Sequence, residues 1–493
     1  MRSIADLSAT PRFVPLALSC AVWLTLSGCA TTGLDSKPVE PGRIEQLLEP
    51  KAEVPAALRP FVLRDQEQGR RDRVLNEAMA GLVALELSQP QTAQRLLSDA
   101  QSLIETIYAQ NPAANRARSN FVPEADKDFK GDPYERAMVG YYLALADFSD
   151  PDLDNARADL RFAEIQDTMS ASETYQSDMI VMPFIRGWLY NCSGRSAQAK
   201  DEFKAVEKAK PGIKIPAASD NVLLIAEVGR APGKIASGRH QEELRYARHD
   251  DGLIRGVTFT QGSQLLVGQQ IEDVYWQAST RGGRAVDKIL AGKASFRNTA
   301  ENIATGAAVF AHITSDLARD AARRKDSDDA GQYAGLAVLG MLVSIGSDIV
   351  AASTHPEADT RTWSTLPDRI YVATTQADTN GETTPWSLGF HDAKGELQSA
   401  VEMRTFRSGA CMLVWGRQYP GSFPSSWTDS SSRHEAAIHE TCQGGCNAVA
   451  EQVARDASNF KTPLVPLASP PDEPVKVESS TTFRRRIFLT YPE

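Results

Sequence analysis

The chain has 493 residues, of which 42% are hydrophobic and 24% are charged, and its formal net charge is −10. This composition is typical of globular proteins, and the length allows two to four domains with substantial cores. A chain that is acidic overall and shows no basic stripe is a poor candidate for binding nucleic acid or anionic lipid headgroups.

The first residues indicate export from the cytoplasm. Arg2 and Arg12 give a positive segment before the apolar run Phe13–Leu26, which has the length of a signal sequence's hydrophobic region and is too short to span a bilayer. The following run Leu26-Ser27-Gly28-Cys29 resembles the lipobox of bacterial lipoproteins. The resemblance implies that residues 1–28 are removed and that acyl chains on Cys29 anchor the protein to a membrane. Ala30 favours the outer membrane, where we expect the protein to face the periplasm. An ordinary signal peptide that happens to contain cysteine is the alternative.

The first part of the mature chain is expected to be a linker and then an array of helices. Residues 29–69 are assigned to the lipidated cysteine and the linker, and residues 70–215 to the helices. Small and large apolar residues recur there at offsets of about twelve, sixteen and nineteen, as in tetratricopeptide repeats, where small residues let paired helices approach. The pattern occurs three times, as Gly81-Ala93-Leu97-Ala100, Ala144-Ala156-Leu160-Ala163 and Gly187-Ala199-Phe203-Val206. The pattern predicts a TPR-like α-solenoid, and another array of α-hairpins is the alternative.

The remainder predicts a β-rich domain of sandwich or barrel type in two parts, residues 216–293 and 355–493, so that the fold class is α+β. Short β-branched runs bounded by Gly and Ser clusters support this prediction. They are Val222–Ala226, Leu253–Phe259, Leu265–Val267, Ile370–Thr374, Trp386–Phe390, Val401–Phe406, Cys411–Trp415 and, after a Pro-rich tail, Arg486–Tyr491. Residues 294–354 are rich in Ala and Gly at helical spacing and predict an inserted, buried helical hairpin. A hairpin that inserts into a membrane or binds a partner is the alternative.

The histidines and cysteines near the C-terminus do not predict a catalytic or metal site. His434 and His439 are five residues apart, whereas the zinc-protease motif needs a spacing of four to place both on one helical face. Cys442 and Cys446 are expected to form a local disulfide in an oxidising compartment. Cys192, within the helices, is expected to be a buried thiol. We therefore expect no catalytic residue, no metal and no cofactor.

Three distinctive segments carry a family resemblance. They are Phe129–Ala137, Glu227–Lys234 and Asp359–Pro367. Together they resemble a family of bacterial lipoproteins that combine a TPR-like N-terminal half with a smaller C-terminal domain. The resemblance implies an address and an architecture but no catalytic residue. Physically, Asp359 and Arg361 are expected to form an ion pair that fixes the chain where it re-enters the β-rich domain.

The function expected from these features is that of a non-enzymatic scaffold or assembly factor in the cell envelope. The concave surface of the helical repeats would bind a helix or an extended peptide of another envelope protein, while Cys29 holds the protein on the outer membrane. A regulator of peptidoglycan synthesis is one alternative. A periplasmic hydrolase that uses His434, His439 or Cys442 is the other.

Overall fold

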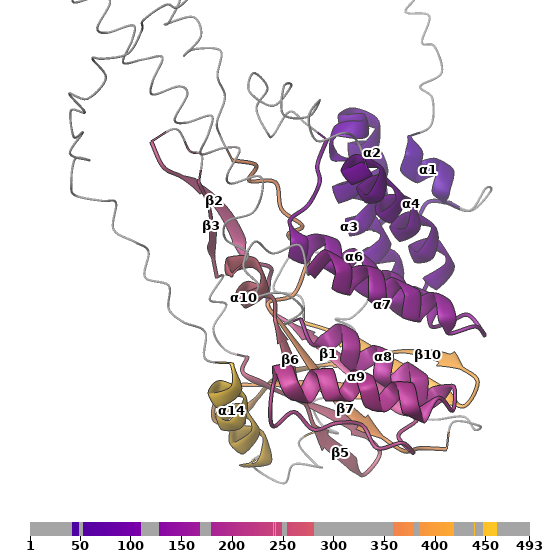
Figure 1. The fold of residues 1–493 in the computed structure, drawn as a ribbon, viewed down its shortest axis with the longest axis vertical. Coiled ribbons are helices and arrows are strands. Elements are labelled where there is room, and N and C mark those ends of the chain that lie inside the picture. Colours follow the sequence, from indigo (N-terminus) through magenta and orange to yellow (C-terminus); the bar gives the residue numbers. More distant parts are fainter. Residues whose placement is uncertain are drawn as a thin grey trace, which may run out of the picture.

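The computed structural model describes residues 42–48, 53–109, 128–167, 179–239, 241, 243–248, 254–280, 358–378, 384–418, 438 and 447–460. Paired helices in the N-terminal part are followed by β-sheets, so the fold is α+β (Figure 1). Within these ranges, no helix is long and apolar enough to cross a membrane.

Three antiparallel pairs dominate the helical part: α3 with α4, α6 with α7, and α8 with α9. The turns fall where the sequence predicts them, and Pro133 and the reciprocal capping bonds of Asp132 and Glu135 start α6. The helices are α1 (Arg43–Leu47), α2 (Arg59–Gln68), the 3-10 helix η1 (Gly69–Asp72), α3 (Arg73–Glu86), α4 (Pro90–Ala109), α6 (Pro133–Asp147), α7 (Asp154–Asp167), α8 (Val181–Cys192) and α9 (Ser196–Ala209). The linker expected over 29–69 is therefore too long, because α1 and α2 lie within it and bury Ile44 and Phe61.

Small residues allow the helices of each pair to approach closely. A Cβ added to Gly81 would lie 2.6 Å from Leu97 Cγ, and one added to Gly187 would lie 2.5 Å from the ring of Phe203. In the middle pair, a Cβ added to Gly140, which the sequence did not single out, would lie 2.6 Å from the backbone oxygen of Asp159. The other expected packing residues are all buried: Ala93, Ala144, Ala156, Ala199 and Phe203.

Two larger sheets and one hairpin form the β-rich part. The five-stranded sheet has the order β10 (Arg404–Ser408), β11 (Cys411–Arg417), β1 (Val222–Val228), β7 (Arg369–Thr375), β6 (Gln269–Asp273). The four-stranded sheet has the order β5 (Gln264–Val267), β4 (Gly256–Gln261), β8 (Ser387–His391), β9 (Leu397–Glu402). The hairpin joins β2 (Gly233–Ser237) to β3 (Glu243–Ala247), and two further helices are α10 (Val274–Ser279) and α14 (Asn447–Asn459). All pairings are antiparallel except that of β1 with β11.

The five-stranded sheet is the middle layer of the molecule. Alternate residues of β1 point to opposite faces: Leu223 and Ile225 join the core shared with the helices, whereas Val222 and Leu224 join the core shared with the four-stranded sheet. This explains why every residue of β1 is buried. On the outer side, α14 covers β4 and β5, where Val449 lies against Gly256.

The inner helices of the pairs pack against the protein's own sheet. All fifteen residues of α6 are buried, and the indole of Trp188 on α8 donates to the backbone oxygen of Asp220 just before β1. At the end of α3, Arg404 of β10 donates to the backbone oxygen of Glu86. The inner surface of the array, which was expected to take a partner, is thus occupied by β-strands of the same chain.

Several local predictions need correction. The single strand expected over Val401–Phe406 is two strands in different sheets, because the chain crosses from β9 to β10 at the buried Met403. Strands β2, β3 and β6 were not predicted. The predicted hairpin over 294–354 and the predicted last strand lie outside the described residues.

A disulfide joins Cys192 at the end of α8 to Cys411 at the start of β11, a sequence separation of 219. The expectation that Cys192 is a reduced thiol was therefore wrong. The sequence placed Cys192 among the helices as a buried thiol. It is only partly buried, and the tertiary fold brings the end of α8 to the start of β11. The bond ties the last helical pair to the middle sheet.

Candidate functional site

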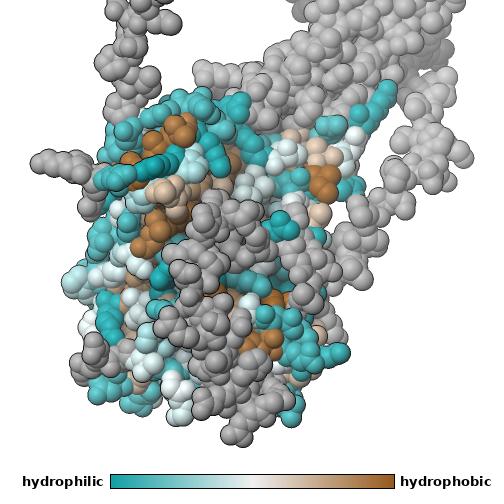
Figure 2. Space-filling model, turned by 180° about the vertical axis from the view of Figure 1, so that it is seen from behind, coloured by the Kyte–Doolittle hydropathy of each residue, from teal (hydrophilic) through white to brown (hydrophobic). Residues whose placement is uncertain are grey.

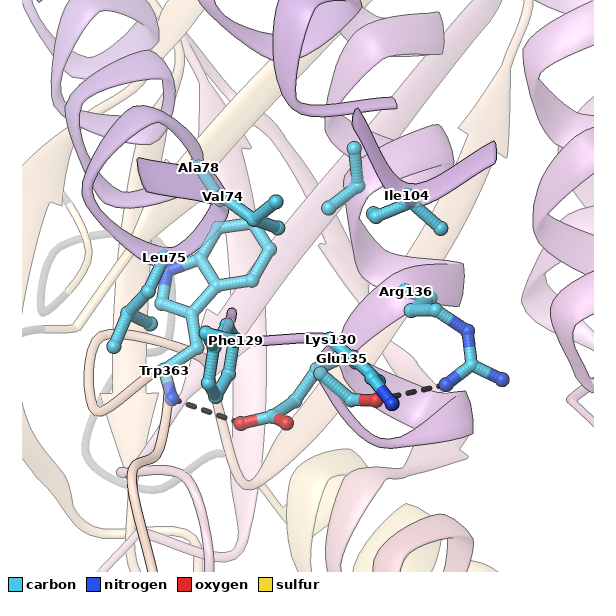
Figure 3. Close-up of a pocket in the computed structure, with 11 residues that line it drawn as sticks. Val74, Leu75, Ala78, Ile104, Phe129, Lys130, Glu135, Arg136 and Trp363 are labelled. Atoms are coloured by element: carbon cyan, nitrogen blue, oxygen red, sulfur yellow. Dashed lines mark hydrogen bonds between the residues drawn. The ribbon is translucent and has the colours of Figure 1, made fainter. Parts of the chain in front are cut away.

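The three distinctive segments of the sequence meet between the helices and the five-stranded sheet. Residues 129–137 form the approach to α6 and its first turn, residues 227–234 connect β1 to β2, and residues 359–367 lead into β7. Figure 3 shows the first and third of these segments, where Glu135 reaches the backbone of Trp363 beside Phe129. Segments that lie 90 or more residues apart in the chain thus build one cluster.

Lys234 is the centre of this cluster. Its Nζ lies 2.6 Å from Glu135 Oε2 and 2.9 Å from Asp132 Oδ2, and it donates to the backbone oxygen of Arg361 at 2.8 Å. The side chain is only 3% exposed. Burial alone would lower the pKa of Lys234, but the two carboxylates outweigh burial and raise it. The lysine therefore stays charged at neutral pH.

Glu135 connects all three segments. One carboxylate oxygen accepts from the backbone N–H of Asp132 at 2.7 Å and from Lys234, and the other accepts from the backbone N–H of Trp363 at 2.9 Å. Asp132 also accepts from the hydroxyl of Tyr246 on β3 at 2.5 Å. One helix N-terminus therefore holds the β2–β3 hairpin and the chain that enters β7.

Arg361 extends the cluster to the N-terminal helices. It forms an ion pair with Asp359 at 2.7 Å, as the sequence predicted, and a second ion pair with Asp72 of η1 at 2.6 Å. The ring of Phe129 lies 5.3 Å from the Arg361 guanidinium carbon and 5.5 Å from Lys234 Nζ. Both cations thus flank one aromatic side chain.

A second buried cluster surrounds Glu227, the last inward-facing residue of β1. Its carboxylate accepts from the hydroxyls of Tyr141 and Tyr142 on α6, at 3.1 and 2.7 Å, and from the indole N–H of Trp415 on β11, at 2.9 Å. Arg417 Nε lies 2.9 Å from the same carboxylate. Burial and the adjacent carboxylate raise the pKa of both tyrosines well above the ordinary value, so their hydroxyls remain donors.

The two clusters form one polar seam, here defined as the Lys234 and Glu227 clusters with the 359–367 segment between them. The rings of Tyr142 and Trp363 are 5.6 Å apart. Arg417 donates to the backbone oxygen of Thr365 and pairs with Glu86 at the end of α3 at 2.7 Å. The seam runs between the helices and the middle sheet and joins them through charged hydrogen bonds.

The geometry of the seam is not that of a catalytic site. Lys234 is held as a cation between carboxylates and so lacks the free lone pair that a nucleophile or base requires. The apolar recess beside it has a volume of about 10 Å³ and is lined by Val74, Ile104, Phe129 and Trp363, among others. That is room for about one water and not for a substrate.

A second arrangement has the distances of a nucleophile and a base but is closed. Thr258 Oγ lies 2.8 Å from His391 Nε2, and His391 Nδ1 lies 3.1 Å from the backbone oxygen of Gly395. Thr258 and His391 are buried, and a Cβ on Gly389 would lie 2.7 Å from the threonine hydroxyl and 2.9 Å from Ile438. The pair satisfies its own hydrogen bonds beneath Ile438. Nothing in the sequence signalled it, since 133 residues separate its members.

Two pairs of acidic side chains lie within the helical hairpins. Burial raises the pKa of Glu77 on α3 to about 9, and Asp99 on α4 adds to the rise. Burial likewise raises the pKa of Asp159 on α7 to about 8, and Asp147 on α6 adds to it. Each pair therefore holds a proton at neutral pH, which turns a repulsion between helices into a hydrogen-bonded contact.

The residues that the sequence singled out for chemistry lie largely outside the described part of the chain. This holds for Cys29, His434, His439, Cys442 and Cys446. Among the described residues, no group of three or more His, Cys, Asp or Glu side chains could hold a metal ion.

No protein-family model, curated protein or solved structure matches this chain.

Proposed function

We propose that this chain is an exported lipoprotein, acylated at Cys29 and held on the periplasmic side of the outer membrane, where it acts as a non-enzymatic scaffold or assembly factor for other envelope proteins. The lipobox-like run that ends at Cys29 supports the address. The Cys192–Cys411 disulfide is consistent with an oxidising compartment.

The observation that carries the scaffold proposal is the polar seam. A buried network of paired charges adds little to stability compared with apolar packing, but it fixes one geometry between the elements it joins. Here it fixes the helices on the sheet, and the disulfide adds a covalent link at the other end of the middle sheet. A platform of this kind presents a preorganised surface, which lowers the entropic cost of binding a partner.

The surface that we propose for partners is the outer side of the helical pairs. The inner helices are covered by the five-stranded sheet, whereas on α9 only Ala199, Phe203 and Val206 are buried. We propose that the pairs are degenerate TPR-like repeats mounted on a β-sandwich, which would present α4, α7 and α9 rather than a concave groove. Secretion, surface-assembly and cell-wall synthesis machines are the partner classes that fit an outer-membrane anchor.

Site-specific photo-crosslinking in cells tests the proposal. A photoreactive residue would replace Ile165 on α7, which is 49% exposed, or Lys204 on the exposed face of α9, with Gln398 on β9 as a matched exposed control. We expect one defined envelope protein to be crosslinked from the helical positions and not from the control. Adducts only from the control, or none at all, would contradict a scaffold that binds through its helices. A peptidoglycan synthase as the crosslinked protein would identify the regulator of cell-wall synthesis.

A further inference from the structure

The segment that forms α2 and η1 exposes most of its arginines and buries both of its aspartates, while its one glutamate, Glu67, is exposed. The side chains of Arg59, Arg70 and Arg71 are 55%, 59% and 47% exposed. In contrast, Asp65 is fully buried and Asp72 is 4% exposed. The exposed side chains of this segment therefore carry more positive charge than the segment as a whole, although the formal net charge of the chain is −10. Since charges act over about one Debye length, roughly 8–10 Å, the local surface and not the net charge decides what it attracts.

An exposed leucine lies on the same face. Leu63 is 58% exposed and lies one helical turn after Arg59. The neighbouring Arg64 stacks on the ring of Phe61 at 5.3 Å, which keeps a further cation along α2. Figure 2 shows hydrophobic side chains gathered over the N-terminal helices, at the upper left of that view. Exposed arginines beside an exposed leucine are typical of a helix that contacts a lipid interface. Glu67, which lies one helical turn after Leu63, is also exposed, whereas Phe61 and Val62 of α2 are buried in the protein core.

The chain enters the fold beside this face. The backbone N–H of Ile44 donates to Asp65 Oδ2 at 2.9 Å, and a Cβ on Gly42 would lie 2.8 Å from the same oxygen and 3.1 Å from Gln66 Cγ. Arg43 pairs with Asp99 and fixes α1 there. Residues 29–41 span about 45 Å if fully extended, and roughly 20 Å as a flexible chain. A lipid on Cys29 would therefore keep α2 close to the membrane.

We propose that the basic face of α2 and η1, formed by Arg59, Leu63, Arg64, Arg70 and Arg71, rests on an anionic phospholipid surface. The arginines contact the headgroup phosphates and Leu63 enters the interface. The ion pairs of Arg59 with Glu53 and of Arg70 with Asp128 are exposed and weak, so they yield to phosphate. Arg71 pairs with the buried Asp72 at 3.0 Å and keeps this partner while its exposed side faces the headgroups. The proposal rests on the proposed lipoprotein anchor in one respect: the anchor at Cys29 brings the face to the membrane and supplies the effective concentration that a small face needs. Contact through this face orients the helical array with α2 on the membrane and the later helical pairs farther from it.

Vesicle co-sedimentation tests the face without the anchor. The mature chain with Cys29→Ser, which has no acyl chain, is mixed with vesicles of phosphatidylethanolamine and phosphatidylglycerol at low salt. We expect measurable binding that weakens with added salt and with vesicles of phosphatidylcholine alone. Arg70→Gln is expected to lower the partition coefficient about fivefold, the effect of about one interfacial arginine. Leu63→Ser is expected to lower it severalfold, and circular dichroism checks that both variants fold.

Ile165→Ser is the matched control, since Ile165 is 49% exposed but lies on α7. It is expected to bind as the parent does. Equal binding by all three variants, or no binding by the parent, overturns the proposal. Labelled fatty acid incorporated into the chain with Cys29 intact reports on the anchor separately, so failure of the anchor and failure of the face give different results.

Discussion

Replacing Glu77 with glutamine should make the protein's stability less dependent on pH. Glu77 is fully buried on α3, and burial together with Asp99 raises its pKa to about 9. In the unfolded chain a glutamate has a pKa of about 4.3. Between these two values the folded state holds a proton that the unfolded state releases, so the free energy of unfolding falls as pH rises.

The size of the effect follows from the number of protons. One proton bound only by the folded state gives a slope of about 1.4 kcal/mol per pH unit. This slope does not depend on the exact pKa of Glu77, provided that the pH lies between the unfolded and folded values. Raising the pH from 6 to 8 should therefore lower the unfolding free energy of the wild type by about 2.7 kcal/mol more than that of Glu77→Gln.

Urea unfolding of the mature chain at pH 6, 7 and 8 measures these slopes. Glu77→Leu is a second variant without a carboxyl group, and it should show the same shallower slope as Glu77→Gln even if its absolute stability differs. Slopes of wild type and both variants that agree within error would refute the view that Glu77 is protonated in the folded protein.

Three further perturbations test the packing of the fold, each by urea unfolding at pH 7. Gly187→Ala should cost roughly 1–3 kcal/mol, because its Cβ would lie 2.5 Å from an aromatic ring, whereas the exposed Lys200→Ala should change stability by less than about 0.5 kcal/mol. Equal small effects from the two would show that the pair is not packed through Gly187. Cys192→Ser should cost about 2–5 kcal/mol, and reducing agent should destabilise the wild type but not this variant; an unchanged midpoint would contradict the disulfide. Lys234→Met should cost about 3–5 kcal/mol, because it leaves Asp132 and Glu135 without their cation, and a neutral result would argue against the polar seam as the joint.

The sequence predicted those features that depend on local pattern. Helical spacing and the breaks at 88–90, 150–151 and 193–194 placed the three main helical pairs, and the β-branched runs placed most strands of the two larger sheets. The same local reasoning missed α2, whose exposed Leu63 and many charges hide its periodicity, and it merged β9 with β10. A strand that ends at Glu402 and another that begins at Arg404 look continuous unless the two sheets are known.

Features that depend on the tertiary fold could not be predicted. Cys192 and Cys411 are paired only because α8 packs at the edge of the middle sheet. The three distinctive segments were recognised one by one, and one ion pair within them, Asp359 with Arg361, was expected. Their convergence on Lys234 was not, since the contacts among the three segments span as many as 228 residues. Glu227 likewise looked like any residue in a strand until α6 supplied two tyrosines.

The most direct test of the proposed address is a mass map of the mature protein, extracted from membranes without reduction. We expect the chain to begin at an acylated Cys29 and to yield a linked peptide pair containing Cys192 and Cys411, with Cys442 joined to Cys446. A chain that retains residues 1–28, or begins at an unmodified Cys29, would contradict the lipoprotein account. Cys192 recovered as a free thiol would contradict the disulfide and remove its support for an oxidising compartment.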